Sequence, residues 1–270
     1  MRKIENVKSF PGVARGRIIH SVTESLKYSL ISLFGKINDE TTVEAAESQF
    51  AIYNHRKYCV AFPLARVAIL VALKSLGLKP GDKILMPCLT IKPILDVVVS
   101  LKLQPVYIDY DEDTCFFDLN QLETIDTDLK AVLATPLFGI APDMNKLLDF
   151  CNRSGAKLIE DFSQALNCEY DGKRIGSFGK ISIYSASSIK TLDSLGGGYF
   201  LTDDHDLYKA AKQFQNNLSP PSRLQIFRRA ALNLIRNVAT TPFGFNFITR
   251  YYLAAQSRFS PEGELRQTGT

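Results

Sequence analysis

An aspartate, a serine and a lysine are spaced along residues 160–190, in the stretch EDFSQALNCEYDGKRIGSFGKISIYSASSIK. Asp161 ends one apolar run, Ser185 ends a later one, and Lys190 lies 29 residues after Asp161. A lysine amine can form a Schiff base with an aldehyde cofactor, and a buried carboxylate can keep a pyridine nitrogen protonated. These are the two protein groups that pyridoxal phosphate (PLP) chemistry most needs. The alternative is a solvated lysine and an aspartate that caps the next helix.

The elements that position these side chains are expected to alternate between strands and helices from about residue 60 onward. Apolar runs predict strands over 80–87, 104–110, 130–139, 157–162, 180–185 and 197–204. Helical patterns are present over 42–55, 64–78, 92–103, 119–125, 142–155 and 205–216. This alternation is typical of an α/β fold with a mainly parallel (mixed) sheet and helices on both faces. Ligands of such sheets bind beyond the carboxyl ends of the strands, which is where Asp161 is expected.

The chain is expected to divide into three regions. Residues 1–58 form an N-terminal lead-in, residues 59–217 the large domain, and residues 218–270 a basic, apolar helical segment with a tail. Pro220 and Pro221 mark the second boundary. The formal net charge is +4, and residues 216–270 carry seven arginines and two glutamates. All of the excess positive charge therefore lies in the last fifth of the chain.

Residues 219–260 contain no acidic residue and mix arginines with aromatic and aliphatic side chains. One interpretation is an amphipathic helix in peripheral contact with an anionic membrane surface. The other is an insertion whose apolar face packs on a further domain or a second subunit. The second is favoured, because partly buried helices are far commoner than membrane-surface helices. No nucleic-acid-binding module is recognisable, so nucleic acid is not expected as a partner.

Several other classes of function lack a sequence signal. Neither GxGxxG nor GxxxxGK[ST] occurs, which argues against dinucleotide and P-loop chemistry. The five cysteines are widely spaced without a CxxC pair. This spacing argues against a zinc site, so no metal is expected. It also argues against a disulfide framework, which favours the cytoplasm as the compartment. The N-terminus lacks the apolar core of a signal peptide, and no run is long enough for a transmembrane helix.

Five ordered motifs between about residues 60 and 215 carry a family resemblance. They are LGLKPGDKILMP, QPVYIDYDEDTCFFD, TPLFGIAPDM, LIEDFSQALNCEYDGKRIGSFGKI and YSASSIKTLDSLGGGYFLTDD. In this order and spacing they resemble the large domain of the DegT/DnrJ/StrS family, the PLP-dependent sugar aminotransferases. The resemblance implies the large domain of the PLP-transferase type I fold, with PLP as the cofactor.

The resemblance assigns a role to each matching residue. Asp161 matches the aspartate that pairs with the pyridine nitrogen, and Gln164 the glutamine beside the ring hydroxyl. Ser185 matches the serine that binds the cofactor phosphate. Lys190 matches the Schiff-base lysine, which also carries the proton between the cofactor and the substrate carbon.

Other positions match the family pattern but differ in residue type. Ala65 and Arg66 fall on the Gly-Thr pair whose backbone amides hold the phosphate. Ile91 replaces the aromatic residue that stacks on the pyridine ring, and Pro136 replaces a histidine. The sequence ends 80 residues after Lys190, and these 80 do not resemble the family's C-terminal small domain. That domain is therefore expected to be absent.

The resemblance implies an aminotransferase that acts on a nucleotide-linked keto sugar, through Lys190, with glutamate as the amino donor. It also implies a homodimer, because sites of this family form at a dimer interface. The alternative is a truncated or non-catalytic family member that keeps the fold with weak or no turnover.

Overall fold

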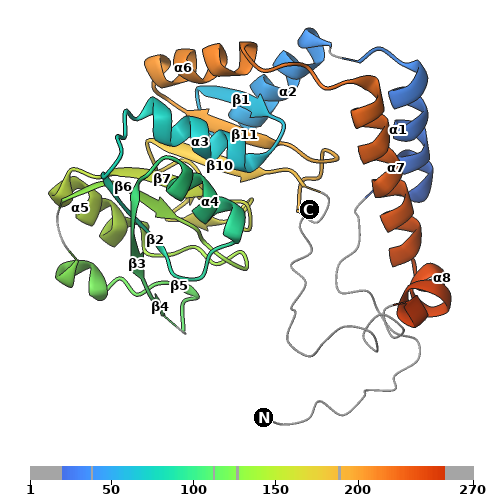
Figure 1. The fold of residues 1–270 in the computed structure, drawn as a ribbon. Helices are drawn as coiled ribbons and strands as arrows, with labels where there is room; N and C mark the ends of the chain where they lie inside the picture. The colour runs from blue at the N-terminus through green and yellow to red at the C-terminus, as the bar shows by residue number, and fades with distance from the viewer. Residues whose placement is uncertain (1–19, 38, 112, 126–127, 188–189, 253–270) are drawn as a thin grey trace. The chain divides into compact units, whose positions relative to one another are not determined.

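The computed structural model describes residues 20–37, 39–111, 113–125, 128–187 and 190–252 (Figure 1). The chain falls into two compact units. Asp39–Pro220 contains the large β-sheet and is called the sheet unit. Met1–Asn38 and Pro221–Thr270 make up the second unit, called the helical unit. The predicted lead-in of residues 1–58 is thus shared between the two, because helix α2 (Glu40–Tyr53) belongs to the sheet unit.

The sheet unit is built on a seven-stranded sheet with the order β1-β11-β10-β7-β6-β2-β3. The strands are β1 (Tyr58–Phe62), β2 (Lys83–Pro87), β3 (Gln104–Ile108), β6 (Leu129–Ala134), β7 (Lys157–Asp161), β10 (Ile181–Ser185) and β11 (Gly198–Thr202). Strands β10, β7, β6, β2 and β3 run parallel, whereas β11 is antiparallel to both of its neighbours. The parallel order brings the carboxyl ends of β10, β7, β6 and β2 to one edge of the sheet.

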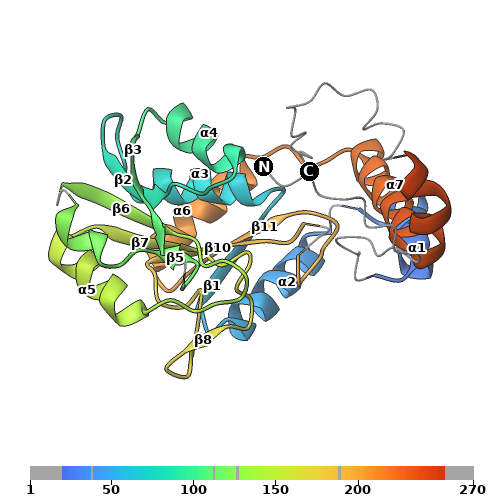
Figure 2. The same cartoon turned by 90° about the horizontal axis from the view of Figure 1, so that it is seen from below.

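Helices cover both faces of this sheet. Figure 2 shows α3 (Ala65–Ser75) and α4 (Lys92–Ser100) on one face, with α2 and α5 (Met144–Ser154) on the other. Side chains of β6 alternate between the two resulting cores, because Leu133 packs with the α3 side and Val132 with the α5 side. Helix α6 (His205–Asn216) adds Leu207 to the α3 side. Both faces are therefore buried, which explains why the strands appear in the sequence as short, nearly continuous apolar runs.

The predicted α/β fold with a mainly parallel, mixed sheet and helices on both faces is confirmed. Five of the six predicted helices appear as α2 to α6, and the sixth appears as a 3-10 turn at Gln121–Thr124. Strand β1, which forms an edge of the sheet, was not predicted from the sequence. Two small hairpins complete the unit, β4 (Tyr110–Asp111) with β5 (Phe116–Phe117), and β8 (Glu169–Tyr170) with β9 (Lys173–Arg174).

The helical unit contains α1 (Val22–Phe34), α7 (Arg223–Thr240), the short α8 (Pro242–Gly244) and the π-helix η2 (Phe245–Thr249). Both long helices start with a capping box, in which a serine side chain accepts from a backbone N–H of the first turn. The capping serines are Ser21 and Ser222. Across the residues that the structure describes, no helix is both long and apolar enough to cross a membrane.

Candidate active site

Asp161 and Ser185 lie together at the carboxyl edge of the sheet. Strands β7 and β10 are parallel neighbours, and Asp161 is in register with Ile183. Ser163 joins the two strand ends, because its hydroxyl donates to Asp161 Oδ1 and accepts from the Ser185 backbone N–H at 2.9 Å. The Ser163 backbone N–H also donates to Asp161 Oδ1, at 3.1 Å. One carboxylate oxygen of Asp161 is thereby fixed in position, which leaves the other oxygen for a further partner.

Lys190 is brought to the same edge by the loop that follows β10. Its backbone N–H donates to the Ser187 carbonyl at 2.9 Å, and the Ala186 carbonyl accepts from the N–H groups of Ser194 and Gly196, each at 3.1 Å. Burial lowers the pKa of the Lys190 ammonium, and the charge of Asp161 partly offsets this. Burial likewise raises the pKa of the Asp161 carboxyl, against the hydrogen bonds from Ser163 and the charge of Lys190. Burial thus disfavours the charged form of each group, and the charge of the other partly offsets this.

The N-terminus of α3 lies beside Ser185. Gly198 pairs with Ser185 across β10 and β11, and a Cβ atom at Gly198 would lie 2.4 Å from both Cα and N of Ala65. Only glycine allows this approach. Leu64 is the N-cap of α3 and supplies no side-chain hydrogen bond, and the first N–H groups of a helix have no intrahelical partner. These amides, at Ala65 and Arg66, can hold an anion next to the Ser185 hydroxyl.

Two buried hydroxyls near this edge have no hydrogen-bond partner within the described part of the chain. They are Tyr110 Oη, which follows β3, and Thr135 Oγ1, which follows β6. Burial raises the pKa of Tyr110 to about 12, and the charges of Cys88 and Asp161 add to the effect. Buried hydroxyls are normally hydrogen-bonded, so these two fit a polar ligand at the end of β7.

The two remaining predicted residues are placed at the loops of this edge with their side chains exposed. Gln164 follows Ser163 after β7. Ile91 is the N-cap of α4, in the segment after β2, and is 64% exposed. The structure thus brings Asp161, Ser185, Lys190 and the start of α3 together, whereas it shows no bond from Gln164 or Ile91 to them.

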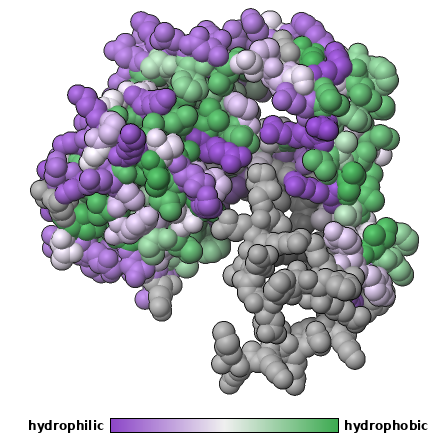
Figure 3. Space-filling model, in the orientation of Figure 1, coloured by the Kyte–Doolittle hydropathy of each residue, from purple (hydrophilic) through white to green (hydrophobic). Residues whose placement is uncertain are grey.

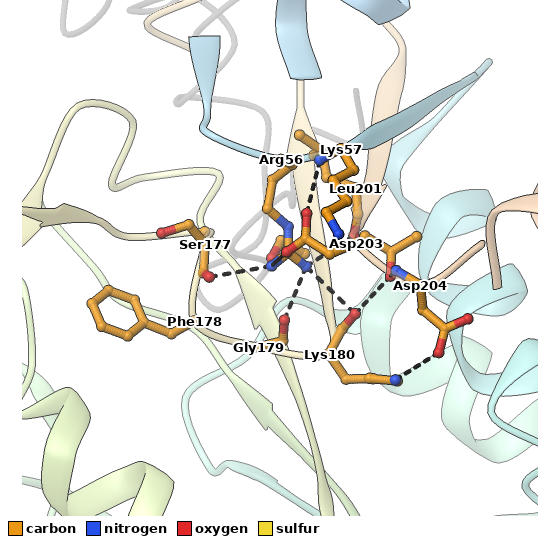
Figure 4. Close-up of polar contacts among 12 residues, drawn as sticks. Arg56, Lys57, Ser177, Phe178, Gly179, Lys180, Leu201, Asp203 and Asp204 are labelled. Atoms are coloured by element: carbon orange, nitrogen blue, oxygen red, sulfur yellow. Dashed lines mark hydrogen bonds and ion pairs between the residues drawn. The ribbon is translucent and has the colours of Figure 1, made fainter. Parts of the chain in front are cut away.

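A buried ion cluster stabilises the loop behind β7, and the sequence analysis did not find it. Glu160 is fully buried and accepts from the N–H groups of Gly176 at 2.7 Å and Phe178 at 2.8 Å. Arg56 binds the same loop through its carbonyls, donating to Gly179 O at 2.9 Å, and forms an ion pair with Asp203 at 3.0 Å (Figure 4). The cluster fixes the strand that carries Asp161. The sequence hint for this cluster was the acidic pair at 160 and 161. Neighbouring strand residues point to opposite faces, so if Asp161 faces the site, Glu160 points away from it and needs a partner of its own.

Ser163, Tyr110 and Thr135 were also not identified from the sequence. Each lies one or two residues beyond the carboxyl end of a strand. Because ligands of such sheets bind there, this position could have identified all three from the sequence. Among the described residues, no group of three His, Cys, Asp or Glu side chains is arranged to hold a metal ion.

A comparison with protein families matches residues 15–247 to the model of the DegT/DnrJ/EryC1/StrS aminotransferase family. The GDP-perosamine synthase of Escherichia coli O157:H7 is 29% identical over 174 residues, which are 64% of this chain and 48% of the relative. The L-glutamine:2-deoxy-scyllo-inosose aminotransferase of Streptomyces kanamyceticus is 32% identical over 167 residues, which are 60% of this chain and 39% of the relative. The chain thus spans about half the length of the curated relatives it matches, or less.

Solved structures show the same fold. An aminotransferase from Psychrobacter cryohalolentis superposes with a TM-score of 0.67 at 21% identity, over 82% of this chain and 63% of that one. An E. coli GDP-4-keto-6-deoxy-D-mannose-3-dehydratase with bound hydrated PLP superposes with a TM-score of 0.66 at 18% identity, over 84% of this chain and 69% of that one.

Proposed function

Since the chain belongs to the DegT/DnrJ/EryC1/StrS aminotransferase family, we propose that it is a PLP-dependent aminotransferase of a nucleotide-linked keto sugar, with glutamate as the amino donor. The observation that carries the proposal is the buried Asp161 carboxylate, which is 5% exposed and shares Ser163 as a hydrogen-bond partner with Ser185, next to the N-terminus of α3. A buried carboxylate is costly unless a partner or ligand uses it, and this favours a binding site at this end of the strands.

The residues around the pair fit PLP. Asp161 would hold the pyridine nitrogen, and Ser185 with the amides of Ala65 and Arg66 would hold the phosphate. Gln164 and Ile91 would lie along the ring. When bound, PLP withdraws electrons from the carbon that carries the transferred amino group.

The chain's own residues supply orientation and proton transfer. Ser163 fixes one oxygen of Asp161, so that the carboxylate keeps a single orientation toward the ring nitrogen. Burial favours the uncharged Lys190 amine, which is the nucleophilic form and can accept a proton. In the overall reaction, the amino group of glutamate replaces the keto oxygen of the sugar, and 2-oxoglutarate is released.

The relative that makes GDP-perosamine, a nucleotide-linked amino sugar, supports the substrate class. The relative that transfers an amino group from L-glutamine to 2-deoxy-scyllo-inosose supports the aminotransfer but not the nucleotide. The proposal includes a homodimer, by resemblance to the family. It places the enzyme in the cytoplasm, because all five cysteines are free thiols, which fits a reducing compartment.

The proposal is tested by trapping PLP on the full chain. The protein is incubated with PLP, reduced with borohydride and digested, and the modified peptide is identified by mass spectrometry. The expected label is on Lys190, and Lys190→Ala abolishes it while Lys209→Ala, a change at an exposed lysine, retains it. Release of 2-oxoglutarate from glutamate with a keto-sugar acceptor tests turnover. Labelling without release would support the non-catalytic alternative, and no label in the wild type would contradict the cofactor assignment.

A further inference from the structure

The contact between α1 and α7 is made of small and polar side chains. The buried residues of the two helices are Ser25, Ser29, Ser32, Ala230, Asn233 and Asn237. Polar bonds hold the helices antiparallel. Arg223, at the start of α7, donates to the carbonyls of Ser32 and Gly35 at the end of α1. Asn237, near the end of α7, donates to the His20 carbonyl at 2.6 Å and to Ser25 Oγ at 2.9 Å.

Most of the large apolar side chains of the same helices are exposed. Each of the following is at least 42% exposed: Leu26, Leu30, Ile31, Phe34, Leu224, Leu232, Ile235 and Val238. Beyond α7, Phe243, Phe247, Ile248, Tyr251 and Tyr252 are more than half exposed. Figure 3 shows hydrophobic side chains, in green, gathered along α1, α7 and α8. A two-helix unit that packs in water places its leucines between the helices, so this arrangement is reversed.

A reversed arrangement is typical of helices that meet a lipid phase. There, small residues let the helix backbones approach, Ser and Asn hydrogen-bond across the contact, and apolar side chains face outward. Exposed tyrosines and phenylalanines beside such a face fit the headgroup level, where one end of a tyrosine ring is apolar and the other is wet. The packing inside the helical unit thus indicates a hydrophobic surrounding for the outer faces of α1 and α7.

The charge of the helical unit identifies the kind of surface. Within residues 20–37 and 221–252, Glu24 is the one acidic residue. The basic residues there are Lys27, Lys36, Arg223, Arg228, Arg229, Arg236 and Arg250. Seven basic residues and one acid give a net charge of +6 with His20 neutral. A second copy would bring the same positive charge against itself, whereas an anionic leaflet complements it.

We propose that the helical unit docks on an anionic phospholipid surface. The apolar side chains of α1 and α7 enter the headgroup layer, and arginines such as Arg228 and Arg229 contact lipid phosphates. This docking goes beyond the proposed transamination and does not depend on it. Docking of this kind attaches the sheet unit to a membrane although neither α1 nor α7 crosses the bilayer.

Vesicle flotation of the full chain tests this docking. We expect the wild type to float with vesicles of phosphatidylcholine mixed with phosphatidylglycerol, and to remain behind with phosphatidylcholine alone. Ile235→Glu places a charge on the apolar face and is expected to weaken binding by about ten-fold or more. Val99→Glu, at an exposed apolar residue of α4 in the sheet unit, is the matched control and leaves binding unchanged.

The arginines are tested by Arg228→Gln and Arg229→Gln, each expected to weaken binding by roughly five-fold. Circular dichroism confirms that each variant is folded. A wild type that does not float with anionic vesicles overturns the proposal, as does an Ile235→Glu variant that floats equally well. Analytical ultracentrifugation identifies the competing outcome, a dimer that Ile235→Glu dissociates in the absence of lipid. None of these measurements involves PLP, so they are independent of the proposed reaction.

Discussion

The sheet unit and the helical unit bury opposite kinds of side chain. In the sheet unit, aliphatic and aromatic residues fill two cores, and the buried charges of Arg56, Glu160 and Asp161 bind loops or face the site. In the helical unit, serines and asparagines lie between the helices and most of the leucines are exposed. A filled core is sufficient for folding, whereas an exposed apolar face is stabilised only when something covers it. The comparison separates residues that make the fold from residues that require a partner.

The largest effect is expected at the buried ion cluster of the sheet unit. Arg56→Met removes the guanidinium that binds the carbonyls of Ser177 and Gly179 and the carboxylate of Asp203. Those acceptors, and the nearby Glu160, lose a buried cation. We expect the free energy of unfolding to fall by about 3–5 kcal/mol, measured by urea denaturation followed by circular dichroism.

The control for this change is Lys57→Met, at the exposed neighbour of Arg56. It retains the backbone bond from Lys57 to Asp203 and is expected to change the free energy of unfolding by less than about 0.5 kcal/mol. An Arg56→Met variant as stable as this control would show that the cluster does not stabilise the sheet unit.

Sequence patterns predicted the parallel strands because β2, β6, β7 and β10 are buried on both faces and therefore appear as short apolar runs bounded by polar residues or turns. They did not predict β1, whose five residues follow a helix without a strong turn signal. Nor could they show the role of Arg56, because its acceptors Ser177 and Gly179 are more than 120 residues away in the sequence. In α1 the residues Val22, Leu26 and Leu30 have helical spacing, yet spacing alone does not show whether that stripe faces a core or the surroundings.

In the candidate site, too, local patterns predicted some residues, whereas contacts between distant residues could not be predicted. Strand order is enough to place Asp161 and Ser185 at one edge, and Lys190 stood out by its chemistry. The resemblance added the α3 amides and the match of Lys190 to the Schiff-base lysine. The hydrogen bond from the Ser185 N–H to Ser163 and the unpartnered hydroxyl of Tyr110 arise only when separate strands meet, and no local pattern encodes them.

The next largest effect is expected inside the helical unit. Asn237→Ala removes two hydrogen bonds and leaves Ser25 and the His20 carbonyl without that donor. We expect a loss of about 1–3 kcal/mol, confined to this unit and measured as faster amide hydrogen exchange in α1. Asn233→Ala is the matched control one turn away, because the buried Nδ2 of Asn233 has no partner among the described residues. Equal losses for both variants would contradict the role given to the polar contact.

A change of opposite sign is expected at Asp161. Burial raises the pKa of Asp161 in the folded chain above its unfolded value of about 4, so the fold favours the protonated carboxyl. The stability that this group contributes is therefore complete below a pH of about 4 and is lost as the pH rises through the folded pKa. Asp161→Asn removes this loss and is expected to stabilise the cofactor-free chain by about 0.5–2 kcal/mol near neutral pH, with little gain in mild acid. Urea denaturation at both pH values measures it, and dialysis of the PLP-loaded chain should show faster loss of cofactor. A variant less stable than the wild type at neutral pH would mean that attraction to Lys190 outweighs burial.

The smallest effect concerns an exposed apolar residue in the sheet unit, where a ligand and not a membrane is expected to cover it. Ile91 is 64% exposed at the start of α4, and an aromatic ring there would stack on a bound pyridine. Ile91→Tyr is therefore expected to tighten PLP binding by about 0.5–1.5 kcal/mol without changing stability, measured by equilibrium dialysis. Leu89→Tyr, at a residue 63% exposed in the same segment, is the control and should leave the affinity unchanged. If both variants bind PLP as the wild type does, Ile91 does not face the ring, and its exposure has no more meaning than that of Leu89.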